Sequence, residues 1–270
     1  MKIAALLLLA GLALYGFQRM RSPYYDSGRV NAPYEREMQN PADDPPDALE
    51  KAEYSFARLR YRGYGGFRRS SWGTDSNKAE RQFVQGVRRL TRVHTRSVEQ
   101  IVDVDSDDIY NWPWLYAVEV GYWQLDQSQA KRLRDYLDRG GFLMVDDFHG
   151  NTEWSIFMES LSKVFPDRGV EDLADSNEIF HTLYDLQHRI QIPGARAWAD
   201  GVTYEQPEDG GKEPHWRAVF DDRNRVVVAI CHDMDLGDAW EHADDPLYPE
   251  NMTGLAYRIA INYVVYDMTH

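Results

Sequence analysis

Hydrophobic and polar positions repeat with two different periods in residues 54–270, and this change of period predicts strands that alternate with helices. The first strand is expected within residues 54–62, where apolar side chains alternate with arginines. One face of that strand is charged, so we expect it to be partly exposed or to face a polar cleft. A run of four apolar residues, 142–145, indicates a strand covered on both faces. Further strands are expected at residues 98–104 and 115–120, and as a hairpin at 217–220 and 226–230.

Start and stop signals for helices stand between the predicted strands. Asn77 with Glu80, and Asp126 with Gln129, fit the spacing of capping boxes. The second of these helices is expected to end at Gly140, because glycine enters the left-handed cap conformation without steric cost. Two more helices are expected, one from about residue 152 to residue 166 and the last from about residue 251 or 253.

The alternation of strands and capped helices predicts an α/β fold. We expect a three-layer sandwich with a mostly parallel sheet and the late hairpin as an antiparallel edge. This single domain is expected to span residues 52–270, with an irregular insertion near residues 187–214, which are rich in Pro, Gly and Asp. Residues 22–51 shift to Pro, Asp, Asn and Tyr and are expected to form a flexible tether.

An apolar run at residues 3–17 follows Lys2 and predicts a signal or membrane-anchor segment at residues 1–21. Its length of about 15 residues is typical of a signal sequence and short for a membrane span. No cleavage site of small residues follows the run directly, which favours an uncleaved anchor. We therefore expect a protein held in the membrane by its N-terminus, with its domain outside the cytoplasm, in the periplasm. Cleavage would make it a secreted protein.

The chain is acidic, with a formal net charge of −14 at pH 7. Nucleic acid is therefore not an expected partner, because binding its backbone relies on clustered Lys and Arg. Cys231 is the only cysteine, so no intrachain disulfide can form. It ends an apolar run and is expected to be a buried, inert thiol. The adjacent His232 leaves a nucleophile as the alternative.

Asp146, Asp147 and His149 directly follow the predicted strand at residues 142–145. In open α/β sheets, ligands bind at the carboxyl ends of strands. Two carboxylates and an imidazole at such a point could hold a divalent metal or act as general acid and base. The alternative is that one aspartate caps the next turn while His149 is merely exposed. All three are candidate catalytic residues, and Asp147 and His149 are also candidate metal ligands.

The densest group of acids and imidazoles follows the later strand at residues 226–230. Asp233 and Asp235 offer carboxylates at alternate positions, which suits hard cations such as Ca²⁺ or Mg²⁺, so both are candidate metal ligands. The spacing does not match an EF-hand loop, and a solvated acidic loop is the alternative. In a parallel sheet, this loop and Asp147 would meet at one edge. The candidate ligand-binding residues here are His232, Asp235, Asp238, Trp240 and Glu241.

Tyr61, Trp72 and Asp75 follow the first predicted strand and should lie at the same edge. An aromatic ring beside an aspartate suits a sugar or another polar ligand, so these three are also candidate ligand-binding residues. The alternative is that Trp72 packs as a lid and Asp75 caps the helix. Arginines at positions 58, 60, 62, 68 and 69 could bind a carboxylate or phosphate, or pair with the protein's own acids.

Four blocks of sequence carry a family resemblance. They are WGTD at residues 72–75 with AER at 79–81, residues 133–150, DLGDAWE at residues 235–241 and YRIAINY at residues 257–263. In this order they resemble the bacterial family called domain of unknown function 4159, over about residues 54–270. The resemblance implies a flavodoxin-like fold similar to class I glutamine amidotransferase domains, and it fits export or membrane anchoring.

Catalytic amidotransferases use a Cys on a sharp strand-to-helix elbow, and the equivalent elbow here carries Asp146 and Asp147 instead. Without that thiolate, the covalent step of glutaminase chemistry is lost. We therefore expect a ligand-binding or assembly module on an amidotransferase-like fold. The alternative is a metal-assisted hydrolase that uses the Asp and His residues at the strand tips. No cofactor is evident apart from a possible divalent metal. The expected partners are membrane-associated proteins or a small polar ligand.

Overall fold

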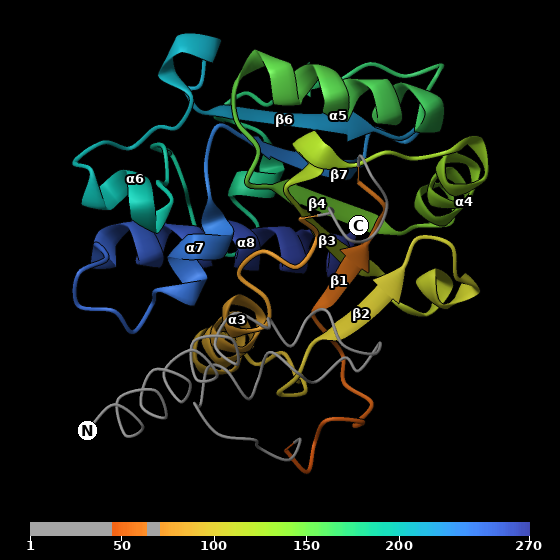
Figure 1. Cartoon of the computed structure of the whole chain (residues 1–270). Helices are drawn as coiled ribbons and strands as arrows, with labels where there is room; N and C mark the ends of the chain where they lie inside the picture. The colour runs from red at the N-terminus through yellow and green to blue at the C-terminus, as the bar shows by residue number, and fades with distance from the viewer. Residues whose placement is uncertain (1–44, 64–70) are drawn as a thin grey trace, which may run out of the picture. The chain divides into compact units, whose positions relative to one another are not determined.

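The computed structural model describes residues 45–63 and 71–270, and Figure 1 shows their arrangement. The strands are β1 (Ala57–Arg60), β2 (Gln100–Asp103), β3 (Trp114–Val118), β4 (Phe142–Asp146), β5 (Glu171–Asp172), β6 (His215–Phe220) and β7 (Val226–His232). They form one sheet in the order β2-β1-β3-β4-β7-β6-β5. The first five strands of this order run parallel, while β6 pairs antiparallel with β7 and with β5. The predicted α/β fold, with a mostly parallel sheet and a late antiparallel hairpin at its edge, is confirmed.

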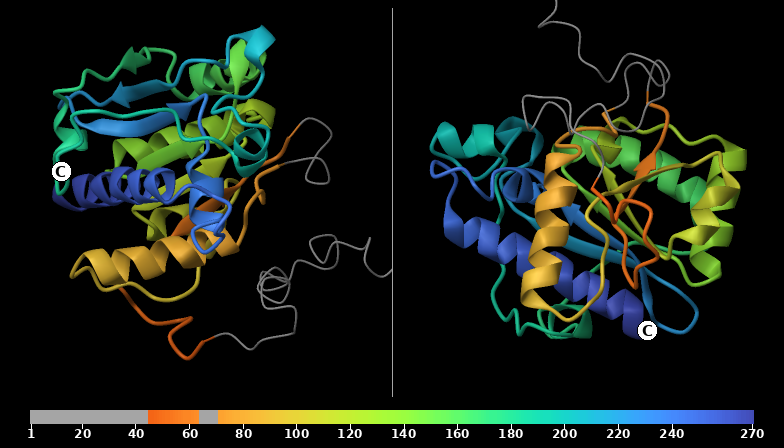
Figure 2. Two further views of the ribbon diagram at one scale, coloured as in Figure 1. Left: turned by 90° about the vertical axis from the view of Figure 1, so that its left-hand side faces the viewer. Right: turned by 90° about the horizontal axis from the view of Figure 1, so that it is seen from below.

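Helices cover both faces of this sheet. The α-helices are α3 (Lys78–Leu90), α4 (Gln127–Asp138), α5 (Gly150–Val164), α6 (Ala195–Ala199), α7 (Leu236–Glu241) and α8 (Glu250–Thr269). Short 3₁₀ turns are η3 (Asp107–Asn111), η4 (Val120–Tyr122), η5 (Glu178–Phe180) and η6 (Pro207–Asp209). Helices α3, α7 and α8 pack together on one face, and α4 packs beside α5 on the other (Figure 2).

The alternation of side chains along each strand divides the core into two layers. In β4, Phe142 and Met144 belong to the layer beneath α3, α7 and α8, and Leu143 and Val145 belong to the layer beneath α4 and α5. Every residue of β3, β4 and β7 is buried, which explains why their sequences are continuous apolar runs rather than alternating ones. These three central strands therefore provide a rigid base for the loops that follow them.

The charged face predicted for the first strand is wrong at its centre. Arg58 is fully buried, where its guanidinium pairs with the equally buried Glu80 of α3. The capping box predicted for Asn77 is also wrong, because Glu80 is engaged by Arg58 and Asn77 donates to Glu99 instead. The capping box of Asp126 and Gln129 at the start of α4 is confirmed.

Two segments are more regular than their composition predicted. The acidic stretch after β7, expected as a loop, contains helix α7, and β5 adds a short edge strand that the sequence pattern did not predict. The last helix begins at Glu250, close to the predicted start. Residues 187–214 are largely irregular, as predicted, apart from α6 and η6.

The predicted anchor at residues 1–21 and most of the predicted tether lie outside the described residues, as do Arg68 and Arg69. Within the described part of the tether, Asp47 accepts hydrogen bonds from Arg88 and Ser97. No helix in residues 45–63 and 71–270 combines the length and hydrophobicity that crossing a membrane requires.

Candidate functional site

The carboxyl ends of β1, β3, β4 and β7 lie at one edge of the sheet, because these strands are parallel. The antiparallel strand β6 begins at the same edge, since His215 pairs with His232 at the end of β7. Strand β1 lies between β2 and β3, so the chain changes direction across the sheet there. Ligands of doubly wound sheets bind at such a switch point. Strands β4 and β7 are parallel neighbours, so the loops that follow them lie together, as the sequence predicted for a parallel sheet.

Strained acidic residues are concentrated in the loops of this edge. Six residues other than glycine have positive φ in the described part of the chain, and four of them are acids that follow strands β1, β3, β4 and β7. These are Asp75, Glu119, Asp147 and Asp233, with φ between 51° and 63°. The left-handed region is costly for most residues with a side chain, and such residues cluster at functional sites.

Asp146 joins the end of β4 to the start of α7. Its Oδ2 accepts hydrogen bonds from the Tyr116 hydroxyl at 3.0 Å and from the backbone N–H groups of Leu236 and Gly237 at 2.9 and 3.0 Å. Its Oδ1 is buried and accepts no hydrogen bond from the described residues. Burial, reinforced by the charge of Asp147, raises the pKa of Asp146 to about 7. Asp146 therefore has a structural role through Oδ2, while Oδ1 remains available to accept a hydrogen bond or to bind a cation.

Asp147 and His149 form a buried pair at the tip of β4. The Asp147 Oδ1 to His149 Nε2 distance is 3.2 Å, while His149 Nδ1 has no hydrogen-bond partner among the described residues. Burial alone would lower the pKa of His149, but the hydrogen bond and charge of Asp147 outweigh it and raise the pKa to about 9. The expectation that His149 is merely exposed is wrong, because the residue is only 5% exposed.

Three carboxylates, which we call the carboxylate group, meet between the loop after β1 and helix α7. They belong to Asp75, Asp235 and Asp238, and each offers an oxygen within 4.8 Å of the others. Burial, followed by the mutual repulsion of neighbouring acids, raises the pKa of Asp75 and of Asp235 well above the usual range. The sequence placed Asp235 and Asp238 in one loop, but it could not show that Asp75, far away in the chain, joins them.

Two glycines allow the backbone to pack closely against the carboxylate group. A Cβ atom at Gly237 would lie 2.5 Å from Asp75 Oδ2 and 3.4 Å from Asp235 Oδ1. A Cβ atom at Gly194 would lie 3.0 Å from Asp235 Oδ2 and 2.7 Å from an oxygen of Glu205. Real Cβ atoms essentially never come within 3.0 Å of another heavy atom, so a side chain at position 237 or 194 would displace Asp75 or Glu205.

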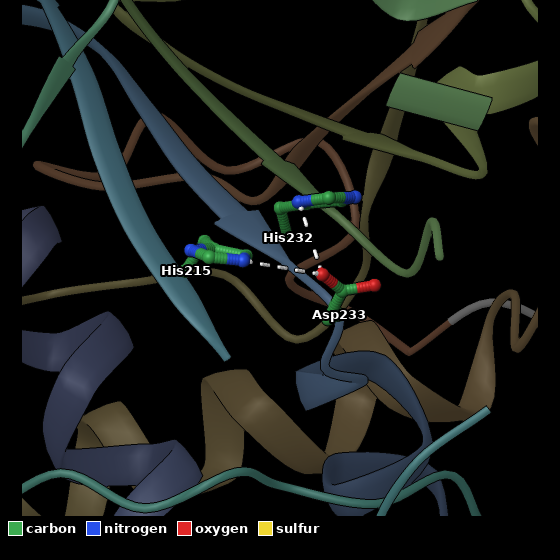
Figure 3. Close-up of side chains that lie close together, drawn as sticks. All are labelled: His215, His232 and Asp233. Carbon is green, nitrogen blue, oxygen red and sulfur yellow. Dashed lines mark ion pairs between the residues drawn. The ribbon is translucent and has the colours of Figure 1, made fainter. Parts of the chain in front are cut away.

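A second group contains two imidazoles and a carboxylate, as Figure 3 shows. Asp233 Oδ2 lies 3.2 Å from His232 Nδ1 and 3.9 Å from His215 Nε2. Burial lowers the pKa of His232 to about 3 and also lowers the pKa of His215, in both cases with a contribution from Arg217. Neutral imidazoles beside a carboxylate are the donor set of transition-metal sites.

Four residues of this edge were not predicted from the sequence, namely His215 and three acids. His215 begins the strand that pairs with β7, so the predicted hairpin could have placed it opposite His232. Glu119 follows β3, and burial together with Asp147 and Glu153 raises its pKa to about 9. Glu153 of α5 and Glu205 of the irregular segment carried no sequence signal, because their neighbours at the site are distant in the chain.

Other candidate residues contact the protein's own groups. Tyr61 is buried, and its hydroxyl donates to the carbonyl groups of Val118 and Glu119. Trp240 is fully buried among aromatic side chains, including Phe83, rather than exposed to a ligand. Trp72 is partly buried beneath the Arg60 guanidinium, and Glu241 Oε2 lies 3.7 Å from His242.

The cysteine and the described arginines also have structural explanations. Cys231 is buried as expected, and desolvation raises the pKa of its thiol, so it is not an activated nucleophile. Arg60 pairs with Asp103, and Arg62 lies 3.3 Å from Asp105. Arg58, Arg60 and Arg62 therefore pair with the protein's own acids.

Comparison with known families places this edge within a recognised domain. A family model described as "Domain of unknown function (DUF4159)" matches residues 55–268. The chain belongs to the DUF4159 family. The matched region includes all seven strands and the acids of the carboxyl edge, so the candidate site is part of the DUF4159 domain itself. No curated protein matches the chain.

Proposed function

We propose that this DUF4159 domain is a cation-dependent ligand-binding module, whose carboxylate group holds a divalent cation such as Ca²⁺, Mg²⁺ or Mn²⁺. One observation carries this proposal: the oxygens of Asp75, Asp235 and Asp238 lie within 4.8 Å of one another. Like charges so close repel strongly, and a hard divalent cation with oxygen ligands removes that cost. The buried Oδ1 of Asp146, which accepts no hydrogen bond from the described part of the chain, adds an independent sign of an unsatisfied acidic site.

The small number of protein ligands explains why the bound cation could also bind a small ligand. Hard cations take six to eight oxygen ligands in proteins. Three carboxylates in single-oxygen contact leave coordination positions for water or for an oxygen atom of a ligand. The glycines at positions 194 and 237 allow the backbone to approach these carboxylates without a side chain that would displace them. A small polar ligand bound through the cation fits this arrangement better than a large apolar one.

The test is the thermal stability of the full chain with and without Ca²⁺, Mg²⁺ and Mn²⁺. A cation that binds only the folded state stabilises it by about 2.7 kcal/mol at one hundred times its Kd. We expect a rise in Tm that Asp235→Asn abolishes, because Asn can still cap α7 but carries no charge. Glu208→Gln, at an exposed position, is the matched control and should keep the full rise. No rise with any of the three cations, or an equal rise in Asp235→Asn, would refute the proposal.

A metal-assisted hydrolase is the second candidate, and the Asp147–His149 pair favours it. Asp147 orients His149 through Nε2, and the opposite ring nitrogen has no partner among the described residues. This is the arrangement of a general acid or base held by a carboxylate. The test is hydrolysis of ester, amide and phosphodiester substrates by the full chain in the presence of divalent metal. Activity that His149→Gln removes and Cys231→Ala retains would support this candidate, and activity that His149→Gln retains would exclude the pair.

A further inference from the structure

The hairpin of β6 and β7 places two imidazoles side by side. His215 and His232 are direct partners in the strand register, and their rings stack with centroids 5.5 Å apart and planes inclined by 19°. Asp233 comes next in the chain and would point to the opposite face if β7 continued. Its φ of 63° interrupts the alternation, and its carboxylate lies beside His232 instead (Figure 3). A costly backbone conformation therefore brings a third donor to the two imidazoles.

The backbone of Gly150 contacts two of these residues, His232 through Nε2 and Asp233 through Oδ1. Its carbonyl oxygen lies 3.2 Å from His232 Nε2, and its N–H donates to Asp233 Oδ1 at 2.7 Å. A carbonyl can only accept, so Nε2 carries the proton and Nδ1 of the neutral ring carries a lone pair, the electron pair that a metal ion would bind. Metal-binding histidines are usually oriented in this way, with the second nitrogen donating to a carbonyl or carboxylate.

The other polar side-chain atoms of these two residues, His232 Nδ1 and Asp233 Oδ2, are both acceptors, and they face each other. His232 Nδ1 lies 3.2 Å from Asp233 Oδ2, and this oxygen accepts no hydrogen bond from the described residues although Asp233 is only 1% exposed. Two facing acceptors repel unless a proton or a metal cation lies between them. His215 Nε2, at 3.9 Å from the same oxygen, provides a third donor atom directed to this point.

We propose that His215, His232 and Asp233 form a binding site for one transition-metal ion of the Zn²⁺ class. Ligand atoms of a tetrahedral zinc site lie about 3.3 Å apart, given bonds of about 2.0–2.1 Å. The observed separations from Asp233 Oδ2, 3.2 and 3.9 Å, are close to this value. Three protein ligands leave a fourth position open, and the His215 side chain is 35% exposed, so the group can be reached from solvent. The site uses nitrogen ligands and does not rest on the carboxylate group.

Arg217 is a cation that lies close to the site. Its Nη1 lies 3.3 Å from His232 Nδ1, which is a long hydrogen bond. The same guanidinium is held by Asp172 through Nε at 2.9 Å and lies over the Trp154 ring at 4.4 Å. These two contacts do not depend on His232, so Nη1 can move away from Nδ1 and leave its lone pair to a metal ion while Asp172 and Trp154 still hold the guanidinium. We expect Arg217→Ala to bind metal at least as tightly as the natural chain.

The test is a titration of the full chain with Co²⁺ after chelator treatment, followed by competition with Zn²⁺. We expect one equivalent of Co²⁺ to produce the visible absorption of a tetrahedral site, and Zn²⁺ to displace it. His215→Ala should weaken binding by more than the about 10–100-fold that loss of an outer contact costs. His94→Ala removes a half-exposed histidine that pairs with Glu50, and it is the matched control that should bind normally.

Two results would overturn the site. One is the absence of a tetrahedral Co²⁺ spectrum in the natural chain, and the other is an unchanged spectrum in both His215→Ala and Asp233→Asn. His215 is partly exposed at the start of a strand, so its variant tests binding without removing a core side chain. A negative result in the Co²⁺ titration would not contradict the cation site proposed at the carboxylate group. That site is tested separately, by the stabilisation with Ca²⁺, Mg²⁺ or Mn²⁺ that Asp235→Asn should remove.

Discussion

Arg58 and Glu80 form a buried ion pair that also fixes the loop carrying Asp75. Both side chains are fully buried, and Arg58 Nη1 donates to the carbonyl groups of Trp72 and Thr74 at 3.0 and 2.8 Å. Removing one member of such a pair leaves an uncompensated charge in the core. We expect Arg58→Met to destabilise the fold by about 3–5 kcal/mol in urea denaturation.

The double variant Arg58→Met with Glu80→Met provides the control for this prediction. It removes both charges, so it should recover much of the lost stability. A loss in the double variant equal to the sum of the two single losses would show that the two residues do not depend on each other. The loop of Asp75 would still lose its two hydrogen bonds from Arg58 in either variant.

Glu119 makes stability depend on pH in a direction opposite to that of an ion-paired acid. Burial and neighbouring acids raise its pKa from 4.5 to about 9. Between these values the unfolded chain has lost the proton while the folded chain keeps it, so stability falls as pH rises from about 4.5 to 9 and then levels off. We expect Glu119→Gln to match the natural chain near pH 5 and to exceed its stability at pH 9 by roughly 1–3 kcal/mol.

Urea denaturation at pH 5, 7 and 9 checks this prediction. Exposed Glu208 provides the control substitution, and Glu208→Gln should leave the pH profile of the natural chain unchanged. A Glu119→Gln profile parallel to that of the natural chain would mean that Glu119 is ionised in the folded state at neutral pH. Such a result would require a cation close to this carboxylate.

Helix α7 is too short to be stable alone, and its first turn depends on two aspartates. Asp146 accepts from the N–H groups of Leu236 and Gly237, and Asp235 accepts from Asp238 at 2.7 Å. We expect Asp146→Ala to cost roughly 3 kcal/mol or more, because it leaves these N–H groups and the Tyr116 hydroxyl without an acceptor. Asp146→Asn keeps one acceptor oxygen and should cost about 1 kcal/mol.

Amide hydrogen exchange of α7, measured beside urea denaturation, tests the local part of this prediction. Faster exchange in α7 than in α4 is expected for Asp146→Ala, since α4 has its own complete capping box. Equal effects of Ala and Asn at position 146 would show that charge, rather than the acceptor, is what α7 requires.

Helices and strands were predicted well from the sequence wherever the contacts that stabilise them are local. The capping box of Asp126 and Gln129 lies within four consecutive residues and was found, and the apolar run of β4 was recognised as a buried strand. The start of α3 was misinterpreted because Glu80 binds Arg58, 22 positions away. Helix α7 was missed because its N–H groups bond to Asp146, 90 positions earlier. Sequence patterns report neighbours in the chain, and these contacts are long-range.

The difference between local and long-range contacts also decides how much of the candidate site could be predicted from the sequence. Strand ends supplied Asp147, His149, Asp233 and Asp235, because a parallel sheet must bring its carboxyl ends to one edge. The pattern could not choose which acids within those loops converge. That choice depends on the register of β6 against β7, which brings in His215, and on the path of the loop after β1, which brings in Asp75.

The described residues contain a complete sheet and both core layers, which predicts that residues 45–270 fold without the preceding segment. Both layers begin within the strand region at Tyr54 and Ala57. Asp47 bonds to Arg88 and Ser97, so a boundary at residue 45 keeps contacts that a boundary at residue 52 would remove. We expect the fragment 45–270 to melt within about 2 °C of the full chain in calorimetry.

A fragment that begins at residue 63 is the matched control, because it lacks β1. Strand β1 pairs with β2 on one side and β3 on the other, so its loss detaches β2 from the sheet and opens both core layers. We expect this fragment to show no cooperative unfolding. If residues 1–21 anchor the protein, the full chain will enter the detergent phase on partitioning while fragment 45–270 stays in the aqueous phase. Aggregation or loss of cooperative melting in fragment 45–270 would show that the domain requires the N-terminal segment, and equal partitioning of the two proteins would contradict the anchor.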